Sequence, residues 1–417
     1  MTDGATATRL AGPATAAGST WTSPATAAAH ALPLVGSDVS DRDQTLRSSI
    51  STMMDQAWRQ PGFCVPNRSV YPHQWLWDSC FHAVIWTALG SDRGVREVDN
   101  VLANIGADGF VPHMTYWTSP RLHARFWGRP LVSTITQPPM YGHAIAELVR
   151  AGHQVSTQTI DRARAGLIHL GRRRRTGAGL IPVFHPWETG CDDSARWDSC
   201  LPPGVVDRVA VWRDRKGRLV EALRRSPEGH AVDSEAFIVG SVGFNALVAW
   251  NADELLHVLP GDPELTALAF DVSRAVADRW RKDRWVDDGP PSGRIRTLDA
   301  MLALLVDPRD GGFDALIDPG AYGAPFGPRG VHRAEPTYEP DVYWRGPAWP
   351  QLSYLLLVAA DRAGHDVTEI LARLLVDGAG RSDLAEYWHP ETGSGLGAKP
   401  QCWAGLALPA LDRLSNH

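Results

Sequence analysis

Cysteine is scarce in this sequence, and long apolar runs are missing. The 417 residues include five cysteines at irregular spacing. This spacing matches neither a secreted disulfide framework nor a paired zinc motif. No stretch approaches the roughly 18 consecutive apolar residues of a membrane span. The first residues also lack the basic and apolar regions of a secretory signal. These absences predict a cytoplasmic protein of a reducing compartment, with no membrane partner.

Positive charge is not in excess either. Lys and Arg number 41 against 47 Asp and Glu, which gives a net charge of -6. A protein that binds nucleic acid would carry a basic stripe, so we expect no such partner. The histidines are scattered without a ligand spacing such as His-Glu-x-x-His, so no metal and no cofactor are expected. The sequence leaves the oligomeric state open.

Tryptophan, by contrast, is abundant. The chain has 17 Trp but only 10 Phe and 8 Tyr, the reverse of the order in an ordinary core. The broad face and single N–H donor of Trp suit stacking on sugar rings, although Trp can equally fill a large core. Both interpretations stay open for each individual tryptophan.

The apolar spacing predicts an all-α protein. Residues 1–38 are poor in charge and in apolar periodicity and are expected to be a mobile or partly ordered leader, before a single catalytic domain at 39–417. From about Ser40, apolar residues recur every three or four positions. Helices are expected at about 40–58, 78–90, 94–105, 137–153, 158–173, 233–258, 263–281, 296–306, 346–364, 366–376 and 400–414. Such helices, stacked as hairpins, would form a toroid with a funnel at one end.

Long loops rich in Gly, Pro, Trp and Asp join these helices. They are expected at 61–77, 108–136, 182–232, 283–295, 308–345 and 377–399. Loops longer than about 15 residues are uncommon unless they are functional. No short repeat is present, which excludes a tetratricopeptide or armadillo solenoid. The residues with interesting chemistry fall almost entirely in these loops.

Two loops place acidic side chains beside tryptophans. The first reads Tyr71-Pro72-His73-Gln74-Trp75-Leu76-Trp77-Asp78. Its Asp78 is either a helix N-cap or a carboxylate that grips vicinal sugar hydroxyls. The second runs from His185 to Asp198 and contains four carboxylates. Carboxylates crowded against aromatic rings and one another acquire raised pKa values, as a general acid requires.

Two further segments lie near the C-terminus. Tyr343-Trp344-Arg345-Gly346-Pro347 reads as a helix start, because Pro is favoured in the first turn. The segment from Glu386 to Gly397 puts an acid before three closely spaced glycines, which permit a close backbone approach. Together the four segments supply an acid, a base, aromatic rings on which a sugar can stack and polar groups that can bind sugar hydroxyls. These are the groups that glycoside hydrolysis needs.

In this order, the four segments resemble glycoside hydrolase family 63, and within it the bacterial mannosylglycerate and glucosylglycerate hydrolase branch. The sequence is more distantly similar to neutral trehalases. The resemblance covers about residues 45 to 412. It implies an (α/α)6 barrel with long funnel-lining loops and an inverting mechanism. It also implies that Asp192 is the general acid and Glu386 the general base, with carboxyls roughly 6.5 to 9.5 Å apart.

The resemblance also implies a set of substrate-binding residues. These are Tyr71, Trp75, Trp77, Asp78, Gln137, Arg196, Tyr343, Trp344, Trp349 and Gln401. His113, in a loop that the resemblance does not match residue by residue, is a further candidate for substrate binding. A glycerate leaving group requires a nearby cation, since guanidinium and ammonium groups bind carboxylates. The candidates are Arg121, Arg125, Arg208 and Arg213. The loops 112–136 and 203–232 remain without an assigned role.

Three alternatives remain. The first is a hydrolase of a neutral disaccharide, of the trehalose or kojibiose type, or of a natural-product glycoside. The second is a non-catalytic helical toroid that binds sugars. The third, a terpene-cyclase-like double helical barrel, fits poorly because the carboxylate loops lack its repeated Gln-Trp elements. The sequence does not identify the sugar or the leaving group.

Overall fold

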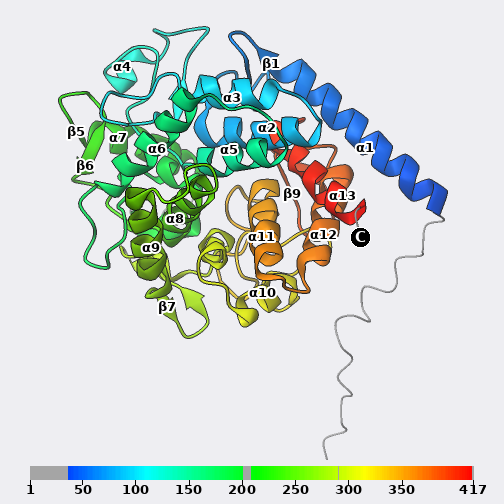
Figure 1. The fold of residues 1–417 in the computed structure, drawn as a ribbon. Coiled ribbons are helices and arrows are strands. Elements are labelled where there is room, and N and C mark those ends of the chain that lie inside the picture. The colour runs from blue at the N-terminus through cyan, green and yellow to red at the C-terminus, as the bar shows by residue number, and fades with distance from the viewer. Residues whose placement is uncertain (1–35, 201–207, 290, 416–417) are drawn as a thin grey trace, which may run out of the picture. The chain divides into compact units, whose positions relative to one another are not determined.

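A computed structural model of the chain describes residues 36–200, 208–289 and 291–415 (Figure 1). The expected leader lies outside these residues as far as residue 35, and residues 36–38 begin helix α1 (Gly36–Ala57). Residues Asp41–His417 form one compact unit. In α1 the buried residues are Leu46, Ile50, Met53, Met54 and Ala57, the spacing expected from the sequence.

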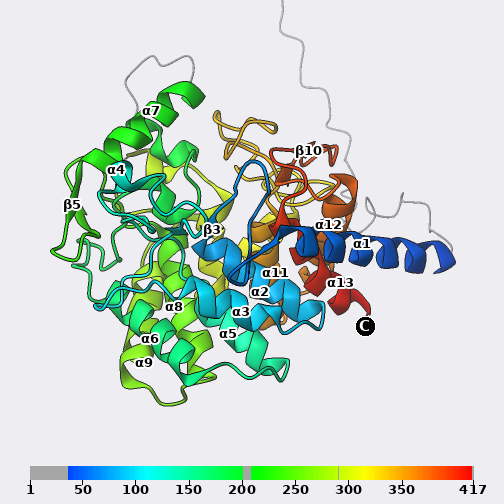
Figure 2. The same ribbon diagram turned by 90° about the horizontal axis from the view of Figure 1, so that it is seen from above.

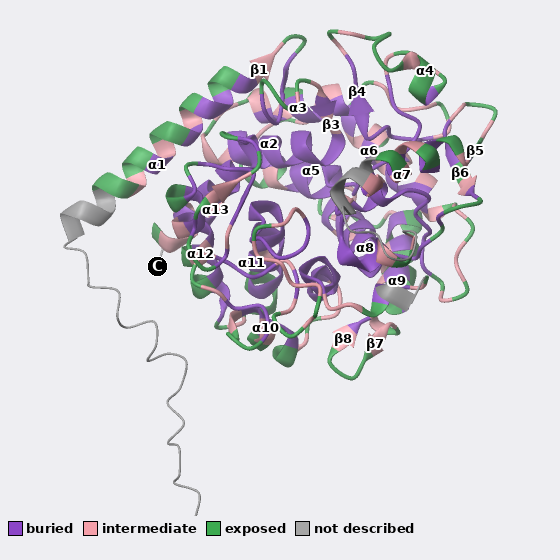
Figure 3. Cartoon of the chain, turned by 180° about the vertical axis from the view of Figure 1, so that it is seen from behind, coloured by how far each residue is buried: buried purple, intermediate pink, exposed green. Residues whose placement is uncertain are grey.

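Six helical elements of this unit contact one another in a closed ring among the described residues. They are α2 (Leu76–Ala88), α5 (Tyr141–Arg150), α8 (Val242–Leu256), the 3-10 helix η6 (Leu298–Leu305), α11 (Pro350–Ala363) and the 3-10 helix η7 (Cys402–Leu406). Nearly every residue of α2 and α8 is buried, and so is most of α11 before its exposed last turn (Figure 3). A helix that is apolar all round must be covered on every side. These elements therefore form the inner layer.

A second layer packs on the outside of this ring. It contains α3 (Arg93–Val101), α6 (Thr157–Gly171), α9 (Pro263–Ala277), α10 (Asp310–Ile317), α12 (Thr368–Arg381) and α13 (Ala407–Ser415). These helices are amphipathic. In α9, for example, Leu265, Leu268, Val272 and Val276 are buried and the opposite face is exposed. Alternating inner and outer helices confirm the predicted all-α toroid.

Local sequence signals set several helix ends. Ser156 and Ser241 accept hydrogen bonds from backbone amides in the first turns of α6 and α8. Asp262 caps α9 directly before Pro263, and α11 begins at Pro350. The cap at Ser241 also corrects one prediction. The helix expected from residue 233 begins at Val242 instead, and the preceding residues include a strand.

Three helices lie where only loops were expected. They are α4 (Ala124–Trp127), α7 (Arg208–Glu221) and α10. The sequence of α7 is rich in charge and contains Gly217, so its apolar periodicity is weak. In Figures 1 and 2, α4, α7 and the neighbouring strand β5 lie on the same side of the unit.

The strands are short and form two-stranded antiparallel ribbons. Their pairs are β1 (Trp58–Arg59) with β2 (Phe63–Cys64), β3 (Gln74–Trp75) with β4 (Met114–Thr115), β5 (Leu223–Arg225) with β6 (Ala231–Ser234), β7 (Trp280–Arg281) with β8 (Arg284–Trp285), and β9 (Tyr387–Trp388) with β10 (Gly395–Leu396). They stiffen the loops between helices. Among the described helices, none combines the length and hydrophobicity needed to span a membrane.

Candidate active site

A cavity of about 410 Å³ lies at the end of the ring where most of the inner helical elements begin. This volume lies within the usual range of small-molecule sites, about 300 to 1,000 Å³. Its walls are Pro66, Tyr71, Trp75, Trp77, Asp78, Gln137, Trp187, Gly190, Asp192, Asp193, Lys216, Tyr343, Trp344, Glu386, Gln401 and Trp403. Apart from Lys216, which lies in α7, these residues lie in the segments before α2, α5, α8, α11 and η7 or in their first turns. The fold thus brings the four sequence segments together.

Asp192 and Asp193 form one acidic edge of the cavity, and both are bound to a lysine. The Nζ atom of Lys216 lies 2.6 Å from Asp192 Oδ2 and 2.5 Å from Asp193 Oδ1. Burial opposes the charge on Lys216, but its two carboxylate partners outweigh burial and raise the pKa of its ammonium group. Burial, and then the charge of Asp192, raise the pKa of Asp193 to about 6. A charged lysine therefore sits beside the predicted general acid.

Glu386 also lines the cavity, and its carboxylate is held by hydrogen bonds. The Tyr71 hydroxyl donates to Glu386 Oε1 over 2.9 Å, and the Ala398 amide donates to Oε2 over 2.9 Å. At Gly397 the main chain passes close to the Glu386 carboxylate. The φ angle there is 70°, and a Cβ atom would lie 2.5 Å from Oε2. The glycine-rich segment after Glu386 therefore permits a close approach, as its sequence predicted.

Burial raises the pKa of Glu386 to about 7, against the opposing effect of the Ala398 and Tyr71 hydrogen bonds. The charge of Asp192 contributes to the same rise, so the two carboxyl groups lie near enough to interact. A pKa near the working pH is what a general base needs, because the group is then both ionised and basic.

Asp78 sits on the floor of the cavity and is not a helix cap. The N-cap of α2 is Trp75, and Asp78 lies within the first turn, almost completely buried. Gln401 Nε2 donates to Asp78 Oδ1 over 3.4 Å. Burial raises the pKa of Asp78 to about 6, although the charge of His82 and the Gln401 hydrogen bond lower it. Between the two alternatives from the sequence, the structure favours a carboxylate that faces the cavity.

Stacked aromatic rings form another wall. Trp344 lies face to face with Trp349, with ring centroids 3.8 Å apart and planes 9° apart. Tyr387 stacks on the other side of Trp349 at 4.5 Å. Trp344 has a φ of 58°, a costly conformation for a residue with a side chain, and such strain is concentrated at functional sites. Of this stack, Trp344 is the ring that faces the cavity.

Three of the residues predicted to bind substrate do not line the cavity. Trp349 lies behind Trp344 and supports it. His113 lies behind Trp75, with ring centroids 5.4 Å apart, and burial lowers the pKa of its imidazole well below the usual value. His113 Nδ1 is bonded to Ser133 Oγ over 2.6 Å. These two residues position rings that face the cavity rather than facing it themselves.

Arg196 is the largest correction to the predicted site. Its side chain is completely buried and forms ion pairs with Asp287 and Asp299, near and within η6. A buried guanidinium needs carboxylate partners, and Asp287 and Asp299 each bind one of its terminal nitrogens. Arg196 thus ties the loop that carries Asp192 to Asp287 and Asp299, and it does not line the cavity. The nearby Arg345 likewise forms a bidentate pair with Asp198, at 2.6 Å for each bond.

The candidate cations for a carboxylate are also reassigned. Arg121 and Arg125 are exposed and do not line the cavity, and the side chains of Arg208 and Arg213 fall outside the described residues. The cation in the cavity wall is Lys216, which the sequence reasoning missed because it placed residues 182–232 in a loop. In a segment that is expected to be a loop, the sequence does not distinguish a charged residue that lines a cavity from one that faces solvent.

The described residues include three clusters whose ligand types and spacing suit a metal ion. They are Cys64 with His82 and Glu97, Asp108 with His169 and His230, and His143 with Glu147 and Glu254. No residue of these clusters lines the cavity. The groups available there for chemistry are carboxylates, one lysine, amides and aromatic hydroxyls.

Comparison with known proteins is consistent with this geometry. Residues 71–404 match the model of the mannosylglycerate hydrolase MGH1-like glycoside hydrolase domain. The chain is 29% identical over 408 residues to the mannosylglycerate hydrolase of one strain of Thermus thermophilus, covering 83% of this chain and 96% of that protein. It is 26% identical over 418 residues to the glucosylglycerate hydrolase of Mycolicibacterium hassiacum, covering 81% and 91%.

A solved structure supports the same assignment. The crystal structure of the glycoside hydrolase family 63 mannosylglycerate hydrolase from another strain of Thermus thermophilus, in complex with Tris and D-glycerate, matches with a TM-score of 0.71 at 25% identity. The match covers 87% of this chain and 99% of that one. The predicted resemblance is confirmed: the chain belongs to the MGH1-like family of glycoside hydrolases.

Proposed function

We propose that this glycosidase is an inverting enzyme that cleaves the α-glycosidic bond of a small glycoside with an anionic leaving group, namely glucosylglycerate or mannosylglycerate. The observation that carries the proposal is the composition of one cavity wall. Asp192 and Glu386 both line the cavity, and Lys216 lies beside Asp192. An acid, a base and a cation for the leaving group thus share one site.

The two carboxyl groups take different roles because their surroundings differ. Glu386 accepts two hydrogen bonds, from Tyr71 and Ala398, which hold it in place to remove a proton from water. Asp192, on the acidic edge, protonates the leaving oxygen. Inversion needs room for a water molecule between sugar and base, so we expect the carboxyl groups to lie roughly 6.5 to 9.5 Å apart. The α preference rests on the family resemblance.

The sugar ring would be bound between polar and aromatic groups. Asp78 and Gln401 offer a carboxylate and an amide on the cavity floor, suited to vicinal hydroxyls. Trp75, Trp77 and Trp344 supply apolar faces in the walls. Tyr343 and Gln137 complete the lining. Buried polar groups that pair with sugar hydroxyls reject ligands that lack them, which gives the site its specificity.

Lys216 would link leaving-group binding to acid catalysis. In the structure its ammonium group neutralises Asp192 and Asp193. A substrate carboxylate entering the site competes for the same ammonium group. When Lys216 turns to the substrate, Asp192 and Asp193 lose their shared cationic partner, and two adjacent carboxyl groups without a cation favour holding a proton between them. An anionic leaving group would therefore help to create the acid that expels it.

The activity should depend on pH through Glu386. Because the pKa of this carboxyl is raised to about 7, Glu386 is protonated below that pH and cannot act as a base. We expect kcat/KM to fall about tenfold per pH unit below roughly pH 7. Tyr71→Phe removes a hydrogen bond that favours the ionised form, so it should move this acid limb to higher pH. A pH–rate profile of both proteins tests this, and an unmoved limb would assign it to another group.

Lys216→Met should lower kcat/KM for glycerate glycosides by about 10- to 100-fold, the value of a lost charge-assisted hydrogen bond. Activity on a neutral glycoside of the same sugar should fall much less, because no carboxylate needs the ammonium group. Lys216→Arg, which keeps the charge, is the matched control and should retain part of the preference. Equal losses on both substrates in Lys216→Met would contradict a role in binding the leaving group.

The direct test is release of free sugar from glucosylglycerate, mannosylglycerate, trehalose and kojibiose, with Glu386→Gln as the blank. Turnover of a glycerate compound, absent in the blank, is the expected result. Turnover of a neutral disaccharide alone would favour the alternative substrate class. No turnover by folded protein across the panel would contradict a small substrate and favour a larger or natural-product glycoside.

A further inference from the structure

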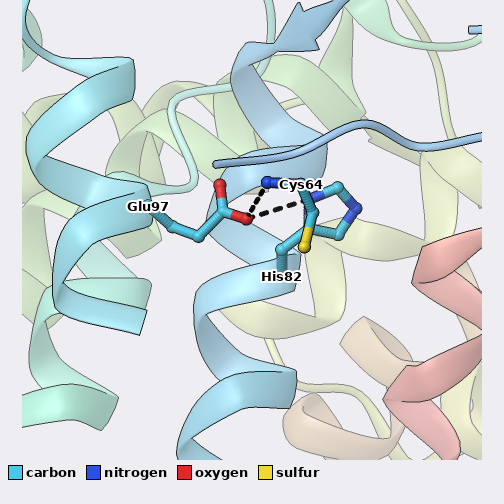
Figure 4. A group of neighbouring side chains, drawn as sticks. All are labelled: Cys64, His82 and Glu97. Atoms are coloured by element: carbon cyan, nitrogen blue, oxygen red, sulfur yellow. Dashed lines mark hydrogen bonds and ion pairs between the residues drawn. The ribbon is translucent and has the colours of Figure 1, made fainter. Parts of the chain in front are cut away.

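A buried cluster outside the active site carries the three ligand types that zinc prefers. It consists of Cys64 in β2, His82 in α2 and Glu97 in α3, whose side chains face one another in Figure 4. All three residues are completely buried. Their ligand atoms (a thiol sulfur, an imidazole nitrogen and a carboxylate oxygen) lie within 4.8 Å of one another. The cluster is separate from the cavity wall.

The hydrogen bonding of this cluster is incomplete among the described residues. Neither ring nitrogen of His82 has a hydrogen-bond partner there, nor does Glu97 Oε2. Glu97 Oε1 accepts from the Cys64 amide over 2.5 Å. A buried polar atom without a partner is costly, and in native proteins it usually indicates an ion or water that would satisfy it. Here three such atoms, both ring nitrogens of His82 and Glu97 Oε2, belong to two neighbouring side chains.

The spacing suits a metal better than a hydrogen bond. His82 Nδ1 lies 3.6 Å from Glu97 Oε1, too far for a good N–H···O bond. Two ligands at about 2.0 to 2.1 Å from a tetrahedral zinc ion lie roughly 3.3 to 3.5 Å from each other. The carboxylate and the imidazole are thus already at nearly the separation that one shared ion would impose.

Charge balance points the same way. Cys64 and Glu97 can together supply two negative charges to an ion, as a thiolate and a carboxylate. A divalent ion would displace the thiol proton and bind one thiolate, one carboxylate and one neutral imidazole. The resulting group has no net charge, which a buried site requires.

We propose that Cys64, His82 and Glu97 bind a structural zinc ion. The ion would join β2, α2 and α3 behind the sugar-binding floor. His82 lies one helical turn after Asp78, and Cys64 lies two residues before Pro66, both of which line the cavity. The site would therefore fix the position of the floor without taking part in the reaction. It does not depend on the identity of the substrate.

The other clusters carry no such inference. In the group of Asp108, His169 and His230, each histidine has a ring nitrogen that already has a polar partner. His169 Nδ1 contacts Asp108 O over 3.0 Å, and His230 Nε2 lies 3.2 Å from Asp108 Oδ2. His143 is bonded through both nitrogens, to Glu254 and Tyr354. These groups are satisfied without an ion.

Metal analysis of the purified, tag-free full chain tests the proposal. We expect about one zinc per chain, removal of zinc by a strong chelator together with a lower Tm, and recovery of Tm when zinc is returned. Cys64→Ser and Glu97→Gln should lose the ion. Cys80→Ser removes a different buried thiol, from the same helix as His82, and should retain it.

A measurement on the unmodified chain covers the case in which these variants do not fold. Refolded with cobalt, the chain should show a thiolate-to-cobalt charge-transfer band, because Cys64 is a ligand. Wild-type protein that contains no zinc and takes up neither metal on refolding would overturn the proposal. Zinc that persists in folded Cys64→Ser at the wild-type level would overturn it as well, because the ion would then lie elsewhere.

Discussion

Replacing Asp192 by Asn is expected to lower kcat on a glycerate glycoside by on the order of 10³-fold. General acid catalysis contributes about 10² to 10⁴ where the leaving group is a poor one. An alkoxide is such a leaving group, and Asn cannot protonate it. The substitution keeps the size of the side chain, and Lys216 retains Asp193 as a partner. Folding and ligand binding should therefore change little, and steady-state kinetics with a thermal melt would check both.

The leaving group separates a loss of acid catalysis from a general loss of function. An α-glycosyl fluoride of the same sugar releases fluoride without needing a proton, so Asp192→Asn should hydrolyse it at a rate close to that of the wild type. Asp193→Asn is the matched control, because Asp193 shares Lys216 but is not the proposed acid. A near-wild-type rate of Asp192→Asn on the glycerate glycoside, or a much larger loss in Asp193→Asn, would remove Asp192 as the acid.

The fold was largely predictable from the sequence. The apolar composition of the inner helices indicates that they are buried, and capping residues indicate where several helices begin. Helix α9, for example, begins at Pro263, as its sequence predicts, whereas α11 begins at Pro350, three residues after the Gly346-Pro347 start that its sequence indicated. The loops were predictable as functional because acids and tryptophans gather in them. The meeting of those loops in one cavity follows from the toroid, since inner helices that alternate with outer ones all begin at the same end.

The errors arose where the sequence does not distinguish a side chain that faces the cavity from one that supports it. The family resemblance implied a ligand contact for Arg196, which lies beside Trp197 and four residues after Asp192. Its true partners, Asp287 and Asp299, are far away in the sequence, and only the fold brings them close. Trp349 was assigned to the pocket for the same reason, although it stacks behind Trp344.

Lys216 was missed for a different reason. It lies in α7, a helix whose high charge and central glycine hide its periodicity. Its two carboxylate partners precede it by more than twenty residues, and no local pattern links them. The cation that we propose to bind the leaving group thus lies in a part of the chain with a weak sequence signal. Surface helices that close over a site have little apolar surface to bury, so this difficulty is a general one.

Replacing Glu386 by Ala should abolish hydrolysis, and azide should restore cleavage with a different product. Without the carboxylate, no group removes a proton from the attacking water, and kcat should fall by on the order of 10³-fold or more. Azide needs no deprotonation and fits the space that the side chain leaves. Its nitrogen would form the bond to the anomeric carbon while Asp192 protonates the departing oxygen. An α-glycoside would then yield the β-glycosyl azide, which NMR of the product identifies.

This product distinguishes the proposed mechanism from its alternatives. Inversion requires the nucleophile to attack from the face opposite the leaving group, so the β configuration follows if Glu386 is the base of an inverting enzyme. Glu386→Gln is the matched control, because it removes the base but leaves no room for azide, and it should stay inactive. An α-glycosyl azide would indicate a covalent intermediate on another carboxylate. Hydrolysis by Glu386→Ala at the wild-type rate would show that water is activated elsewhere, and Asp78, a buried carboxylate on the cavity floor, would become the group to test.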